Sequence, residues 1–77
     1  MEYVKAMKYS KMMKYLRNNK VTCIQFIYNM YEWQECFKSI EEFKNFLENT
    51  FDKNWLKANK YWVPCINDNK SIVIVVD

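Results

Sequence analysis

The sequence predicts an α+β fold, a small single domain covering residues 1–77 in which two helices pack on one face of a mostly antiparallel sheet. Two segments carry apolar residues at helical spacing, and each is followed by a strand-like segment in which apolar residues alternate or run together. A length of 77 residues fits one domain, and 51% hydrophobic residues, many of them aromatic, are enough to form a core. The expected order of elements is α-β-β-α-β-β.

The first helix is expected to begin at Ser10, because serine is a favourable N-cap residue. Its apolar face has i, i+3, i+4, i+7 spacing and consists of Tyr9, Met12, Met13 and Leu16. Asn18-Asn19 ends the helix, since asparagine tolerates the left-handed conformation often found there. Residues 2–8 fit either an additional helical turn or a short edge strand.

Residues 21–37 alternate in the manner of a β-hairpin. With Asn29-Met30 as a two-residue loop, the aromatic residues face each other in pairs, Tyr28 with Tyr31 and Phe26 with Trp33. We expect this aromatic face to belong to the core. The alternative is a platform on which nucleic-acid bases stack.

The same register places Cys23 opposite Cys36, with Cα atoms about 4.5 Å apart. Two buried thiols are expected there, because the chain has three cysteines and no signal peptide, which indicates a reducing compartment. A zinc site is not expected, since the chain has no CxxC motif and no histidine.

The second helix has a stronger start signal, since Ser39 as N-cap and Glu42 at the N3 position form a capping box. An apolar stripe follows, made of Ile40, Phe43, Leu47, Phe51, Trp55 and Ala58. The stripe predicts one long helix to about Asn59. A break near Asn49-Thr50 is the alternative.

The C-terminal segment predicts a second hairpin with its turn at Asn67-Asp68-Asn69. Pro64 has no N–H to donate to a neighbouring strand, so its strand is expected at an edge of the sheet. Residues 71–76, SIVIVV, are apolar on both faces and are expected to form a buried inner strand.

Charge is unevenly distributed, because residues 1–20 carry a net charge of +5 and residues 21–50 a net charge of −3. The basic residues of the first segment recur at every third position: Lys5, Lys8, Lys11, Lys14, Arg17 and Lys20. Three residues correspond to 300° of an α-helix, so the six cannot form one stripe. Either the basic residues within the first helix form only its solvent-exposed face, or all six form a patch that binds phosphates or an acidic protein. The acidic residues are expected to be solvated: Glu32, Glu35, Glu41, Glu42 and Glu48.

The composition argues against catalysis, cofactors and membranes. Histidine is absent, so a nucleophile would lack its commonest base, and glycine is absent, so there is no glycine-rich phosphate loop. No segment is long and apolar enough to span a bilayer, and no signal peptide precedes the domain. We therefore expect a cytoplasmic protein that is not an enzyme and binds no cofactor or metal.

The leading expectation is a non-catalytic protein-interaction module. Eleven lysines against one arginine, with frequent asparagine, isoleucine and tyrosine, indicate an AT-rich gene. Together with the small size, this favours a phage or mobile-element inhibitor, anti-CRISPR-like in style, that binds a host protein or nucleoprotein effector in the host cytoplasm. The alternative is a small nucleic-acid-binding regulator that uses the basic N-terminal segment. A homodimer through the Pro64 strand or residues 2–8 is a third expectation.

Overall fold

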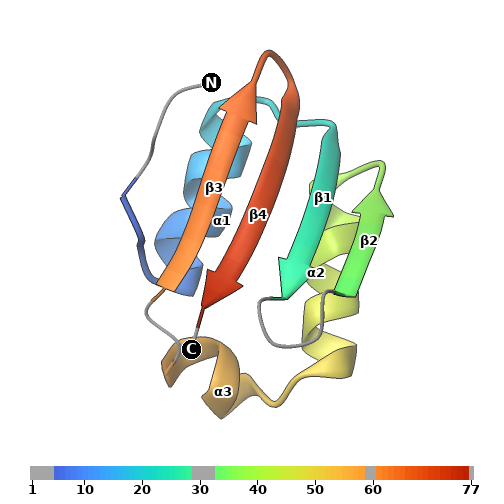
Figure 1. Ribbon diagram of the computed structural model, residues 1–77. Helices are drawn as coiled ribbons and strands as arrows, with labels where there is room; N and C mark the ends of the chain where they lie inside the picture. The colour runs from blue at the N-terminus through green and yellow to red at the C-terminus, as the bar shows by residue number, and fades with distance from the viewer. Residues whose placement is uncertain (1–4, 29–32, 59–60, 77) are drawn as a thin grey trace.

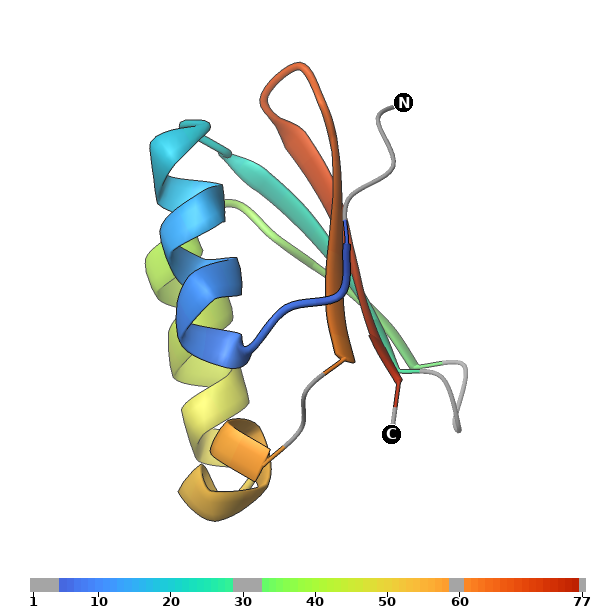
Figure 2. The same cartoon turned by 90° about the vertical axis from the view of Figure 1, so that its left-hand side faces the viewer.

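The computed structural model describes residues 5–28, 33–58 and 61–76, without the side chains of residues 33 and 34. Its elements are α1 (Tyr9–Asn18), β1 (Cys23–Tyr28), β2 (Trp33–Phe37), α2 (Ile40–Thr50), α3 (Lys53–Ala58), β3 (Tyr61–Asn67) and β4 (Lys70–Val76). The strands form one sheet in the order β2-β1-β4-β3 (Figure 1). The helices lie on one side of it (Figure 2), so the predicted α+β class is confirmed.

The sheet is mixed. β1 pairs antiparallel with β2, and β3 pairs antiparallel with β4, while the two inner strands β1 and β4 are parallel to each other. β3 lies at an edge, as expected from Pro64. β4 lies inside the sheet, as expected from its apolar sequence, but only one of its faces is covered. Ser71, Val73 and Val75 are buried, whereas Ile72 and Ile74 on the other face are half-buried.

The predicted start of the first helix is wrong. The N-cap is Lys8, whose backbone is extended and whose side chain makes no capping hydrogen bond, so Ser10 lies inside α1. Starting two residues earlier places Tyr9 in the helix, where its ring packs against Trp62 with ring centroids 5.3 Å apart. The helix ends at Asn18 as expected, but the left-handed residue after it is Lys20, with φ of 53°.

The predicted N-cap Ser39 of the second helix is confirmed, but the return bond of the capping box goes to the preceding residue, Lys38. The Glu42 N–H donates to Ser39 Oγ at 3.1 Å, and the Lys38 N–H donates to Glu42 Oε2 at 3.1 Å. The long helix is wrong, since the chain extends at Phe51 and α3 begins at Lys53. The break stacks Phe51 on Trp55, with centroids 4.4 Å apart.

The first hairpin forms, but its predicted register is wrong. Tyr28 is opposite Trp33, so four residues connect the strands, and Phe26 is opposite Glu35. Asn29-Met30 and Tyr31 lie outside the described residues. Gln25, and not Cys23, is opposite Cys36, and the expectation of two buried thiols is wrong, since Cys23 is half-buried and Cys36 is exposed. A two-residue loop would have required positive φ at Met30, which methionine does not favour.

The core lies between the helices and the sheet. Phe26 is fully buried at its centre, and its ring lies 5.8 Å from Phe43 and 6.4 Å from Trp62. The predicted apolar face of α1 is confirmed, because Met12, Met13 and Leu16 are buried. Tyr28 is also buried, so the described part of the predicted aromatic face belongs to the core.

Candidate functional site

The six basic residues of the N-terminal ladder are exposed, but they do not form one surface. Lys5 and Lys8 precede α1, and Lys20 follows it in the turn to β1. Lys11 and Lys14 lie on the side of α1 that faces away from the core. The structure therefore brings together only part of the predicted patch.

Lys11 and Lys14 line a shallow groove of about 300 Å³. Met7, Tyr15 and Asn18 complete its lining. Two cations beside an aromatic ring and an amide are groups that bind a phosphate and stack with a base. This groove is the part of the ladder that suits an anionic ligand.

Arg17 points towards α2, where its Nη2 lies 3.8 Å from Glu41 Oε1. The side chains are 48% and 72% exposed, so water screens the ion pair. Its contribution to the stability of the fold is therefore about 1 kcal/mol at most. The pair partly neutralises Arg17, which does not line the groove beside Lys11 and Lys14.

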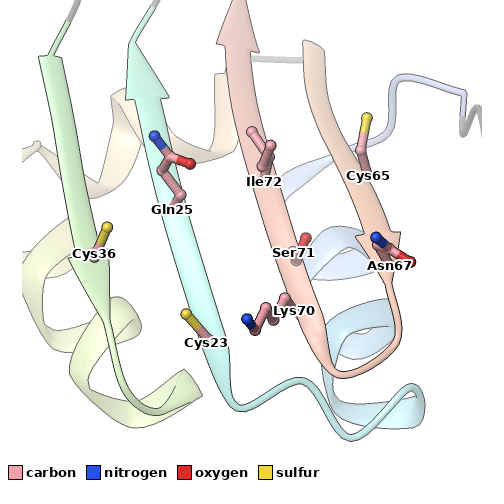
Figure 3. A pocket seen from close by; sticks show the side chains of 8 residues that line it. All are labelled: Cys23, Gln25, Cys36, Cys65, Asn67, Lys70, Ser71 and Ile72. Atoms are coloured by element: carbon pink, nitrogen blue, oxygen red, sulfur yellow. The ribbon is translucent and has the colours of Figure 1, made fainter. Parts of the chain in front are cut away.

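The face of the sheet opposite the helices, which we call the open face, carries partly exposed apolar residues on several strands. Figure 3 looks onto part of it, with the helices behind the sheet. Its residues alternate along the strands with those of the buried face. They are Cys23, Gln25, Ile27, Cys36, Tyr61, Val63, Cys65, Asn67, Lys70, Ile72, Ile74 and Val76.

Strand pairing arranges the open face in rows across the sheet. In one row Ile27 lies beside Ile74 and Ile74 beside Val63, and the register continues from Ile27 to Gln34 of β2. The next row runs Cys36, Gln25, Ile72 and Cys65 through all four strands. A third row is polar, with Cys23 beside Lys70 and Lys70 beside Asn67. The middle of the open face is therefore uncharged and mostly apolar, with Gln25 as a polar exception, and one end is polar.

All three cysteines of the chain lie on the open face, although they come from three different strands. With Gln25, Asn67, Lys70, Ser71 and Ile72 they line a shallow groove of about 250 Å³. Cys36 and Cys65 lie in outer strands, three strand spacings or about 14 Å apart. Within the described ranges, no three His, Cys, Asp or Glu residues are close enough to hold a metal ion.

The size of the open face suits a macromolecule better than a small ligand. Four strands about 4.8 Å apart, and up to seven residues long, form a face of roughly 19 by 23 Å. The resulting footprint is roughly 440 Å², polar end included, which is large enough to contact a macromolecule. Its groove is too shallow to enclose a drug-sized molecule.

A separate buried polar group lies between the helices. The Tyr9 hydroxyl is buried and has no hydrogen-bond partner among the described residues. Burial, and then the negative charge of Glu48, raise the pKa of Tyr9 to about 12, while Arg17 acts in the opposite direction. Nothing in its surroundings gives this hydroxyl a chemical role.

Sequence reasoning identified the basic residues but missed the open face. The signal was present in residues 71–76, whose apolar residues on both faces indicate that both faces are covered. In the structure, the helices cover one of these two faces.

No helix in the described ranges is long and apolar enough to cross a membrane. No protein-family model, curated protein or solved structure matches the chain. Its candidate site is therefore inferred from its own residues alone.

Proposed function

We propose that the chain is a small non-catalytic protein-interaction module that binds a protein partner through the open face. The observation that carries the proposal is β4, an inner strand with Ile72, Ile74 and Val76 only half-buried on its helix-free side. A near-continuous apolar run such as that of β4 is typical of strands covered on both faces. A partner that covers this face removes apolar side chains from water, which is the main driving force of association.

The open face also defines the chemistry of the partner. Its centre carries no charge, so the partner presents an apolar surface there. Lys70 is the one charged residue among the described strand residues of this face, and it lies at the polar end. A carboxylate on the partner is therefore expected opposite Lys70, where it fixes the orientation of the complex.

In this proposal the module acts by occupying its partner's surface, as an inhibitor of a host protein or nucleoprotein effector does. A phage or mobile-element origin is supported by the small size and by the lysine-rich, glycine-free composition. The anti-CRISPR-like role is an analogy of size and style, and the proposed mode of binding does not depend on it.

Site-specific photo-crosslinking tests the proposal. The photoreactive residue p-benzoylphenylalanine is placed at position 72 on the open face or, as the control, at position 53 on exposed α3. The expected result is a protein captured from position 72 alone, which then binds the purified chain. Ile74→Lys and Lys70→Glu are expected to weaken that binding at least about 10-fold, and Lys70→Arg to preserve it. Equal capture from both positions, or unchanged binding by Ile74→Lys, would contradict the proposal.

The groove beside Lys11 and Lys14 supports a second candidate function, a nucleic-acid-binding regulator. Fluorescent single- and double-stranded DNA and RNA test it at about 50 and 200 mM salt, because phosphate contacts weaken as salt rises. Binding that is lost in Lys11→Glu/Lys14→Glu but retained in the matched Lys53→Glu/Lys57→Glu variant would establish this function. No binding at the lower salt would exclude it.

A further inference from the structure

We infer that in the purified protein the open face is closed by a second copy of this chain, so that two sheets stack face to face and a partner must displace the second copy. The inference concerns the surface on which the proposed function rests, and it names the occupant of that surface when no partner is present.

The charges of the open face allow it to pack against itself. The chain has a net charge of +3, yet the row containing Ile74 and the row containing Cys36 and Cys65 carry no charge. Lys70 lies at the end of the face, where its ammonium group stays in water at the rim of a stacked dimer. Two copies therefore bring their apolar rows together without burying like charges.

The shape and chemistry of the face match those of packed sheets. Two sheets pack about 10 Å apart, with the side chains of their inner faces interdigitating. Ile27, Ile74 and Val63 form a row of β-branched residues across the three longest strands, as in the inner layer of a β-sandwich. A symmetric contact requires the same patch on both copies, and this patch is continuous over inner strands β1 and β4.

The area of the face sets the strength of the dimer. Two faces of roughly 19 by 23 Å bury on the order of 900 Å² in total, which is below the roughly 1,000 Å² expected of a stable interface and fits a weak, transient one. Such a dimer exchanges rapidly, because the surplus over the entropy cost of association is small. A partner with a larger complementary surface then displaces the second copy.

Sedimentation velocity from about 5 to 500 μM tests the inference on the wild-type chain and two variants. The wild type is expected to shift from its monomer mass of 9.5 kDa to twice that mass as concentration rises. Ile74→Lys is expected to raise the dimer Kd at least about 100-fold, because two unpaired charges enter the interface. Lys53→Glu, on the helix side, is expected to behave as the wild type.

Alkylation of the unmodified protein by maleimide gives a second measurement that needs no variant to fold. Cys23, Cys36 and Cys65 all lie on the open face, so their alkylation is expected to slow together by at least about 5-fold from 5 to 500 μM protein, at a fixed excess of maleimide. A monomer throughout the range, with alkylation independent of concentration, would overturn the inference. A dimer that persists in folded Ile74→Lys would overturn it too, since the interface would lie elsewhere. If the wild type is monomeric but still crosslinks to a partner from position 72, the dimer inference is overturned and the proposed function is retained.

Discussion

Met7 and Trp62 exchange two backbone hydrogen bonds, although Met7 lies outside the named strands. The Met7 N–H donates to the Trp62 carbonyl at 2.9 Å, and the Trp62 N–H donates to the Met7 carbonyl at 3.1 Å. Pro64, two residues further along β3, has no N–H to offer. This edge of the sheet is therefore poorly suited to adding another strand, and the homodimer expected through the Pro64 strand is not the one we propose.

Replacing Met7 by proline is predicted to destabilise the fold by about 1 kcal/mol or more, because the Trp62 carbonyl loses its donor. Met7→Leu retains the backbone hydrogen bonds and is the matched control. Urea unfolding gives the free energies, and hydrogen exchange at the Trp62 amide is expected to accelerate in the proline variant alone. Equal stability of the two variants would show that the bridge is not formed in solution.

The two serines near helix starts are predicted to differ in their contribution to stability. Ser39→Ala removes the acceptor of the Glu42 N–H and is expected to cost about 1 kcal/mol. Ser10→Ala is expected to change stability by less than about 0.5 kcal/mol, because Ser10 lies inside α1 and is exposed. Thermal unfolding of both variants measures the difference. A larger loss from Ser10→Ala would contradict the observed start of α1.

Two neighbouring residues of β1 face opposite sides of the sheet, and truncating them is predicted to lower the free energy of unfolding by very different amounts. Phe26→Ala empties the centre of the core and is expected to cost about 3–5 kcal/mol. That is a large fraction of the 5–15 kcal/mol typical of a domain. Ile27→Ala, on the open face, is expected to cost less than about 1.5 kcal/mol when measured in dilute protein. Similar costs in urea unfolding would mean that a further layer of the chain covers the open face.

Tyr9 is predicted to make stability fall at alkaline pH. The pKa of Tyr9 is about 12 in the folded chain and 10.0 when unperturbed, so the unfolded state releases the proton first. The contribution of protonated Tyr9 to the free energy of unfolding is therefore fully present below pH 10 and is lost as pH rises to about 12. Tyr9→Phe lacks this loss, and at pH 7 it is expected to be neutral or stabilising, since the hydroxyl has no hydrogen-bond partner among the described residues.

Urea unfolding of Tyr9→Phe and the wild type, repeated from pH 8 to pH 12, measures this difference. The exposed Tyr61→Phe variant is the control for general alkaline effects. A difference between Tyr9→Phe and the wild type that stays constant with pH would show that the Tyr9 hydroxyl is accessible to water in the folded chain.

Local signals in the sequence predicted the elements well, but they could not determine the register of the first hairpin. Pairing Phe26 with Trp33 or with Glu35 differs by two residues, and a shift of two leaves every side chain on the same face. The apolar pattern is therefore identical for both registers. The start of α1 was missed for another reason, since the contact of Tyr9 with Trp62 is a tertiary interaction that outweighs the N-cap preference of Ser10.

The open face could be inferred only once the number and position of the helices were known. The sequence of β4 indicates two covered faces, and the same pattern occurs when a second layer of the same chain covers the strand. The basic ladder was visible in the sequence, but which of its members lie together depends on the ends of α1 and on the Arg17–Glu41 pair. Neither could be read from spacing alone.

Alkylation of the three cysteines in cells tests whether the open face is an interaction surface. Mass spectrometry compares the extent of maleimide labelling at Cys23, Cys36 and Cys65 inside the native cells with that of dilute purified protein. All three are expected to be protected in the cells, because an occupant of the face covers them together. Labelling in the cells at the rate found for the dilute protein would show that the face is uncovered and is not an interaction surface.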